Sequence, residues 1–225
     1  MEDIISYIIN ILLSIPGVMF TFTLKGYSQA LVAKKLGDPT PENQGRLTMN
    51  PMAHIDIIGF ICILLFRFGW CKPVQTNSRY YKHVRRDCAI QILSGPVGLV
   101  IGGFVMSLFY VLTARLFIAF PESTILEYIA AVFSYAAAFP LYLAIFYMLP
   151  LPGLDGYNLI ANFLPYKFNS YLYKIEKYSI FIFLAFILIC DYTPLGNLIF
   201  LPANVLIKLF TDIWSLPVAF LFSLF

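Results

Sequence analysis

Long apolar runs dominate this sequence and restrict the chain to folds that place helices in a lipid bilayer. Of its 225 residues, 60% are hydrophobic and 12% are charged, and the mean hydropathy is +0.80. Soluble domains carry about 25% charged residues, and an apolar helix of about 20 residues crosses the hydrocarbon layer. Because backbone groups in lipid must pair internally, we expect an all-α, polytopic transmembrane helix bundle.

The apolar runs divide the chain into about five to six membrane segments within a single membrane domain, 1–225. The run at 55–68 has only fourteen residues, so we expect 47–68 to dip into the bundle as a short re-entrant segment, with a tilted full span as the alternative. The core occupies about 4–165 and the C-terminal helices about 166–225. The other expected segments are 4–36, 88–120, 128–149, 179–190 and 195–210, followed by an apolar tail from Asp212 to Phe225.

Basic residues cluster in the loop 67–87, which predicts the orientation of the chain. They are opposed there only by Asp87, and positive charges favour the cytoplasmic side, so we expect an integral membrane protein with this loop in the cytoplasm. Membrane lipids are the expected neighbours of these charges, and nothing in the pattern suggests nucleic acid. The basic residues are Arg67, Lys72, Arg79, Lys82, Arg85 and Arg86.

Polar side chains inside or beside the apolar runs are the candidates for function, because each costs free energy in hydrocarbon unless it finds a partner. The first group is in FTLKGYSQALVAKKLGD at 22–38, where Lys25, Ser28 and Gln29 interrupt an apolar helix. The others are GRLTMNPMAHID at 45–56, GWCKPVQTN at 69–77 and MLPLPGLDGYNLI at 148–160.

Taken in order, these four segments resemble the site-2 protease family of intramembrane zinc metalloproteases, in its compact bacterial form without a PDZ domain. The resemblance covers roughly 15–165 and includes the G-D-P-T loop at 37–40. It implies a bacterial cell-membrane protein of the peptidase class, acting in regulated intramembrane proteolysis with zinc as cofactor. The family's third zinc ligand is the aspartate of a P-x-x-x-L-D-G motif, here Asp155.

The H-E-x-x-H motif that should supply two zinc ligands and the catalytic glutamate is replaced by Lys25-Gly26-Tyr27-Ser28-Gln29. On the alignment with the family, Lys25 and Gln29 stand where the histidines belong and Gly26 stands at the glutamate. Zinc needs neutral imidazoles at i and i+4, and hydrolysis needs a carboxylate beside the metal-bound water. We therefore expect no intact catalytic site and no metal, with Asp155 as the one retained ligand position.

Two interpretations apply to Lys25 and two to Asp155. Lys25 could snorkel, with its amine at the membrane interface, or its ammonium could replace the metal and form an ion pair with Asp155. Asp155 could alternatively be the N-cap of the helix that follows it.

A substrate groove is the expected setting for Asn50, Pro51, His54 and Asn77, since the resemblance implies that this region holds an extended peptide. Structural turns are the alternative for these residues. His54 and His83 are in the wrong places for the family's ligands, so structural roles are expected for them. A rebuilt zinc site made by His54, Cys71 and Asp155 is conceivable, although no spacing supports it.

Three functions remain open at this stage. The preferred one is a catalytically inactive pseudoprotease that binds or retains a transmembrane client protein or peptide. The second is an active zinc metalloprotease with a rebuilt metal site. The third, a small transporter or channel subunit, is less favoured because no charged relay crosses the spans.

Overall fold

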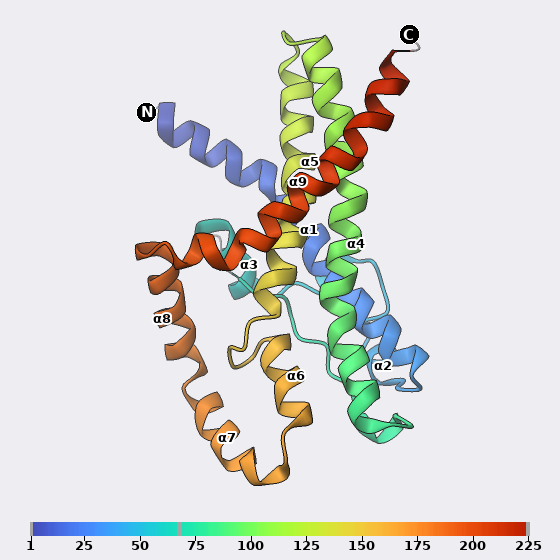
Figure 1. Cartoon of the computed structure of the whole chain (residues 1–225), viewed down its shortest axis with the longest axis vertical. Coiled ribbons are helices and arrows are strands. Elements are labelled where there is room, and N and C mark those ends of the chain that lie inside the picture. Colours follow the sequence, from blue (N-terminus) through green and yellow to red (C-terminus); the bar gives the residue numbers. More distant parts are fainter. Residues whose placement is uncertain (1, 67–68, 224–225) are drawn as a thin grey trace.

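The computed structural model describes residues 2–66 and 69–223, and within these ranges the chain forms helices and no strands (Figure 1). Arg67, one of the predicted topology determinants, lies outside the described residues. The α-helices are α1 (Glu2–Lys35), α2 (Thr40–Asn43), α3 (Ile57–Phe66), α4 (Val84–Ala119), α5 (Thr124–Tyr147), α6 (Asp155–Phe163), α7 (Asn169–Lys177), α8 (Ser179–Tyr192) and α9 (Leu195–Phe222). Three short 3-10 turns are η1 (Pro51–Ala53), η2 (Ser78–Tyr80) and η3 (Tyr166–Phe168).

Four helices, α1, α4, α5 and α9, are long and apolar enough to cross a membrane, and α8 is a shorter apolar helix. This confirms the predicted all-α, polytopic bundle. Helix α3 has ten residues, which rise about 15 Å, roughly half of the hydrocarbon layer. That length fits the predicted dip into the bundle better than a full span.

Small residues on α4 let α1 approach it closely. A Cβ atom at Gly98 would overlap Ser28, and one at Gly102 would overlap Leu24. At Gly95 the added Cβ would lie 2.9 Å from Gln29 Nε2. Glycine faces of this kind allow backbones to pack tightly in membranes. They bring the polar positions of α1 directly against α4.

The C-terminal part differs from the predicted pair of segments, since α9 continues without a break from Leu195 to Phe222. The polar residues near Asp212 do not end the helix, because hydroxyls there bond to the helix's own carbonyls: Thr211 Oγ1 to Lys208 O at 2.8 Å and Ser215 Oγ to Asp212 O at 2.7 Å. Trp214 Nε1 donates to Phe104 O at 3.0 Å, which holds α9 against α4.

The two loop motifs, 45–56 and 69–77, are bound to each other. Arg46 donates to Lys72 O at 2.6 Å, to Pro73 O at 3.0 Å and to Ala53 O. The Lys72 backbone amide donates to His54 O at 2.9 Å. This pairing presents His54 to α1.

Candidate functional site

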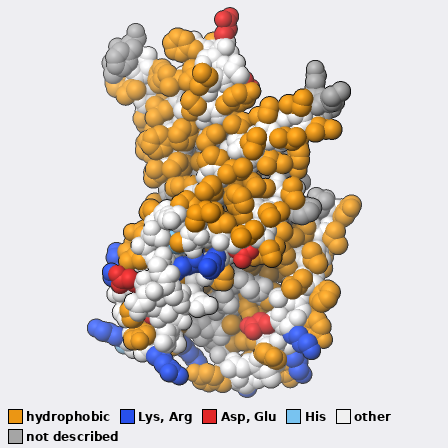
Figure 2. Space-filling view, turned by 180° about the vertical axis from the view of Figure 1, so that it is seen from behind, with side chains coloured by type: hydrophobic (Ala, Val, Ile, Leu, Met, Phe, Trp, Pro, Cys, Tyr) orange, Lys and Arg blue, Asp and Glu red, His pale blue; other side chains and the backbone are white. Residues whose placement is uncertain are grey.

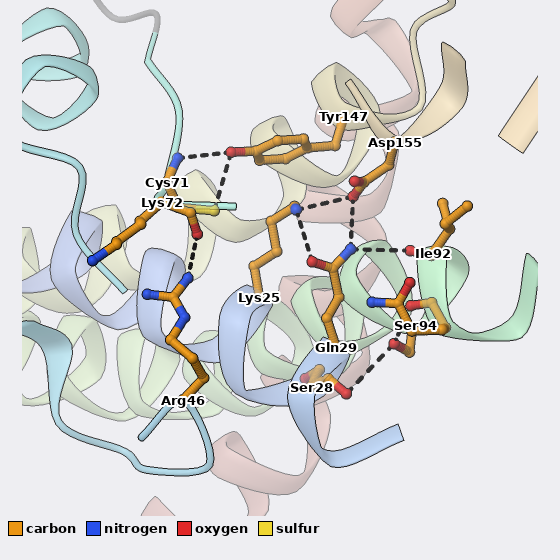
Figure 3. A network of polar contacts seen from close by, with 11 residues as sticks. Lys25, Ser28, Gln29, Arg46, Cys71, Lys72, Ile92, Ser94, Tyr147 and Asp155 are labelled. Carbon is orange, nitrogen blue, oxygen red and sulfur yellow. Dashed lines mark hydrogen bonds and ion pairs between the residues drawn. The ribbon is translucent and has the colours of Figure 1, made fainter. Parts of the chain in front are cut away.

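Lys25 is buried within the bundle, and its ammonium faces a carboxylate. Its residue is 3% exposed, and Nζ lies 3.0 Å from Asp155 Oδ2 (Figure 3). The snorkelling interpretation of Lys25 is therefore wrong, because the amine does not reach the surface. Burying either charge alone would cost several kcal/mol, about the cost of an unpaired ion in a protein interior.

Gln29 completes the cluster, since it contacts both charged groups and a third helix. Its Oε1 accepts from Lys25 Nζ at 3.3 Å, and its Nε2 donates to Asp155 Oδ2 at 3.2 Å and to Ile92 O at 3.3 Å (Figure 3). We call Lys25, Gln29 and Asp155 the buried triad. It joins α1, α4 and α6.

Asp155 is the first residue of α6, and the N-cap position is held by Leu154, without a side-chain cap. The Asp155 carboxylate is directed at Lys25 and Gln29 instead. The N-cap interpretation therefore does not describe this structure. A negative charge in the first turn is still favourable, because the helix dipole is positive there.

Tyr147 closes the other side of the ammonium. Lys25 Nζ lies 3.9 Å from the centre of the Tyr147 ring, within the range of a cation–π contact. The Tyr147 hydroxyl accepts from Cys71 N at 2.8 Å and donates to Cys71 Sγ at 3.2 Å (Figure 3). Neither contact was predicted, although both residues lie in or next to motif segments. Tyr147 links the buried triad to the loop 69–77.

Gly26 faces His54, which is fully buried. A Cβ atom at Gly26 would overlap His54 Nδ1. His54 Nε2 lies 2.8 Å from Thr48 O, and Nδ1 has no hydrogen-bond partner in the described part of the chain. The position predicted for the family's glutamate therefore has no room for a side chain while the His54 ring stays where it is.

The predicted groove residues are in turns. Asn50 Oδ1 accepts from Met52 N at 3.1 Å and caps η1, whose first residue is Pro51. Asn77 Oδ1 accepts from Arg79 N at 3.1 Å and caps η2. These contacts are those of structural turns, the alternative interpretation, and His54 lies inside the protein rather than on its surface. Peptide binding by these residues stays a prediction.

Comparison with known proteins gives the family. The chain is 34% identical over 207 residues to "Putative zinc metalloprotease YwhC" of Bacillus subtilis (strain 168), covering 88% of this chain and 90% of that protein. The chain belongs to the site-2 protease-like family of membrane metalloproteases. No protein-family model matches it, and no solved structure matches it significantly.

Membership of the site-2 protease-like family implies zinc, but the residues present do not fit it. Zinc sites in proteins use thiolate, neutral imidazole or carboxylate ligands. Lys25 offers only donors when charged, the Gln29 amide is committed to its neighbours, and Asp155 already pairs with a cation. Within residues 2–66 and 69–223, no three His, Cys, Asp or Glu side chains are close enough to hold a metal ion. The rebuilt site of His54, Cys71 and Asp155 is therefore not formed.

The stability of this family member should fall in mildly acidic solution because of His54. His54 is fully buried, and its Nδ1 has no hydrogen-bond partner among the described residues, so a second proton on the ring would be a buried charge without an acceptor. At mildly acidic pH the His54 ring therefore binds a proton in the unfolded chain that it does not bind in the folded chain. The free energy of unfolding should fall by up to about 1.4 kcal/mol per pH unit as the pH drops below about 6.5.

Denaturation in detergent micelles between pH 7 and pH 5 measures this effect. His54→Gln should flatten the dependence. His83→Gln is the matched control, since His83 is exposed, and it should leave the slope unchanged. Equal slopes for the wild type and His54→Gln would contradict the assignment.

Proposed function

We propose that this chain is a pseudoprotease of its family, which binds or retains a membrane-protein client without cleaving it. The observation that supports this most is the buried triad, in which the Lys25 ammonium pairs with the one carboxylate that the resemblance assigns to the metal. An ammonium at this place repels a divalent cation and has no lone pair to offer it. The charge that a metal would neutralise is already neutralised by a side chain.

The absence of a base supports the same proposal. Metal-assisted peptide hydrolysis requires a carboxylate that takes a proton from water beside the scissile bond. The alignment puts that carboxylate at Gly26, which has no side chain, and the His54 ring packs against it. Asp155 is held by Lys25 and Gln29 and is not free to act as the base.

Client binding is supported by a cavity of about 590 Å³ between α1, α3, α5, α8 and α9. Its lining is largely apolar but carries pairs of polar side chains: Tyr135 Oη donates to Asn10 Oδ1 at 3.2 Å, and Tyr142 Oη donates to Asn204 Oδ1 at 2.5 Å. The backbone of a client segment can be unwound at membrane depth where protein groups hydrogen-bond to it. The amide and hydroxyl groups that line the cavity can give up their present hydrogen bonds and bond to such a segment instead.

Two measurements test the proposal: the zinc content and cleavage activity of the purified protein in micelles, and photo-crosslinking in cells from two matched positions. We expect zinc well below one ion per chain by elemental analysis and no cleavage of a transmembrane model substrate. A photo-crosslinking residue at Tyr142, in the cavity, should capture an intact membrane protein in cells, whereas one at Ile101, which is exposed on α4, should not.

Other outcomes would overturn the proposal. One zinc per chain with chelator-sensitive cleavage would show a working protease. Ion flux in proteoliposomes, abolished by Lys25→Met, would show a transporter. Equal capture from Tyr142 and Ile101 would remove the argument for client binding at the cavity.

A further inference from the structure

The segment between α6 and α8 exposes an unusual number of aromatic and basic side chains. Tyr166 is 83% exposed and Tyr173 is 73% exposed. Tyrosine rings are amphipathic and are enriched where protein meets the headgroup layer, since the ring lies in the apolar part and the hydroxyl in the wet part. We call 166–178 the tyrosine–lysine segment; its exposed residues of these kinds are Tyr166, Lys167, Phe168, Tyr171, Tyr173, Lys174, Lys177 and Tyr178.

No ion pair joins the segment's lysines to a carboxylate in the part of the chain that the structure describes. Each ammonium lies near an aromatic ring: Lys167 is 5.3 Å from the centre of the Phe168 ring, Lys174 is 5.9 Å from that of Tyr171, and Lys177 is 6.0 Å from that of Tyr178. The segment's single acidic residue is Glu176. The lysines are therefore available to external anions.

The chain path places this segment at the membrane surface. It follows the long apolar helix α5 and the short α6, and it ends at Tyr178, directly before the apolar helix α8. The Tyr157 hydroxyl on α6 donates to Leu172 O at 3.1 Å, which attaches α7 to α6. The segment is thus held to the bundle beside the entry point of α8.

A second basic group lies at the same end of the molecule. Asn162 Nδ2 on α6 donates to Arg85 O at 2.7 Å, which ties α6 to the first turn of α4. Figure 1 shows α7 and the start of α4 at the same end of the bundle, and the Lys and Arg side chains visible in Figure 2 all lie in that half. The exposed basic residues near this turn are Arg79, Lys82, Arg85 and Arg86.

We propose that the tyrosine–lysine segment, together with the basic first turn of α4, is a binding surface for anionic phospholipid headgroups. Basic residues close to an anionic membrane surface are attracted to its headgroups, and the attraction adds up over a cluster. Exposed tyrosines fix the depth of the segment, and the lysines select the charge of the lipid. This surface is separate from the buried triad and from the cavity between α1, α3, α5, α8 and α9, so it does not depend on the proposed function.

The full chain purified in neutral detergent tests this surface with two added lipids, phosphatidylglycerol and phosphatidylcholine. We expect phosphatidylglycerol to raise the midpoint of thermal unfolding more than phosphatidylcholine does, and 0.5 M NaCl to remove most of the difference, because salt screens exposed charges. The variant Lys167→Gln/Lys174→Gln/Lys177→Gln should lose at least half of the difference.

The matched control is Arg115→Gln/Lys208→Gln, which removes two exposed basic residues outside this surface and should keep the full difference. Equal midpoints with the two lipids, or a wild-type response from the triple lysine variant, would overturn the proposal. The salt dependence of the wild type tests the surface even where a variant folds poorly.

Discussion

Replacing Asp155 with asparagine should lower the free energy of unfolding by about 3–5 kcal/mol, because it leaves the Lys25 ammonium buried without a counter-charge. The substitution keeps the size of the side chain, so the loss reports charge rather than packing. Lys25 is 3% exposed and cannot recover hydration by a small movement. Denaturation with a graded detergent mixture, followed by circular dichroism, measures the change.

The exposed pair Lys34–Glu42 is the matched control, with side chains 45% and 44% exposed. Glu42→Gln should cost less than about 1 kcal/mol, as exposed ion pairs do. The double variant Lys25→Met/Asp155→Leu should recover most of the stability lost in Asp155→Asn, since it removes both buried charges. An Asp155→Asn variant as stable as Glu42→Gln would show that the buried pair does not stabilise the fold.

Gly26→Ala should destabilise the protein by about 1–3 kcal/mol, the usual cost of overpacking a well-packed core. The sign of the change in the free energy of unfolding is informative, because replacing glycine with alanine in a helix with open space around it stabilises the protein by about 1 kcal/mol. Here the new methyl group would overlap His54 Nδ1, and the ring is held at its other nitrogen by Thr48 O. The free energy of unfolding in detergent measures the effect.

His54→Ala supplies the control, since it removes the ring that the methyl group meets. In that background Gly26→Ala should be nearly neutral or stabilising, which gives a coupling energy above about 1 kcal/mol between two contacting sites. A Gly26→Ala variant more stable than the wild type would contradict the close contact.

The same contact changes how the family's motif can be restored. Lys25→His, Gly26→Glu and Gln29→His together are the direct restoration, with zinc binding as its measure. Because the His54 ring occupies the space at Gly26, we expect the three changes to yield tight zinc only if that ring also moves. The triple variant and the triple variant with His54→Ala should therefore differ in zinc stoichiometry.

The sequence was sufficient to predict the bundle and to select two members of the buried triad. Apolar runs longer than the hydrocarbon layer predict helices. The resemblance put Lys25 at a lost metal-ligand position and Asp155 at the retained one, and it offered their ion pair as one of two interpretations of Lys25. Gln29 was identified only as a lost ligand. Its contact with Ile92 O depends on how closely α1 packs on Gly95 of α4.

Other features depended on tertiary contacts that have no periodic signal. The Tyr147 ring over Lys25 comes from the end of α5, and the His54 ring over Gly26 comes from the loop motif 45–56, so both contacts join α1 to segments far away in the sequence. The continuity of α9 was missed because Asp212 suggested a boundary, while the hydroxyl of Thr211 is accommodated by the helix's own carbonyls. Local polarity indicated a break that local hydrogen bonding removes.

The buried triad also has a consequence for biogenesis. Gln29 and Asp155 are separated by 126 residues, which a ribosome needs about 6–25 s to add at the usual rates of synthesis. During that interval α1 carries a cation into the bilayer before its counter-ion exists. A nascent or truncated chain that ends before Asp155 therefore lacks the carboxylate that pairs with Lys25, and its ammonium stays unpaired until α6 is made.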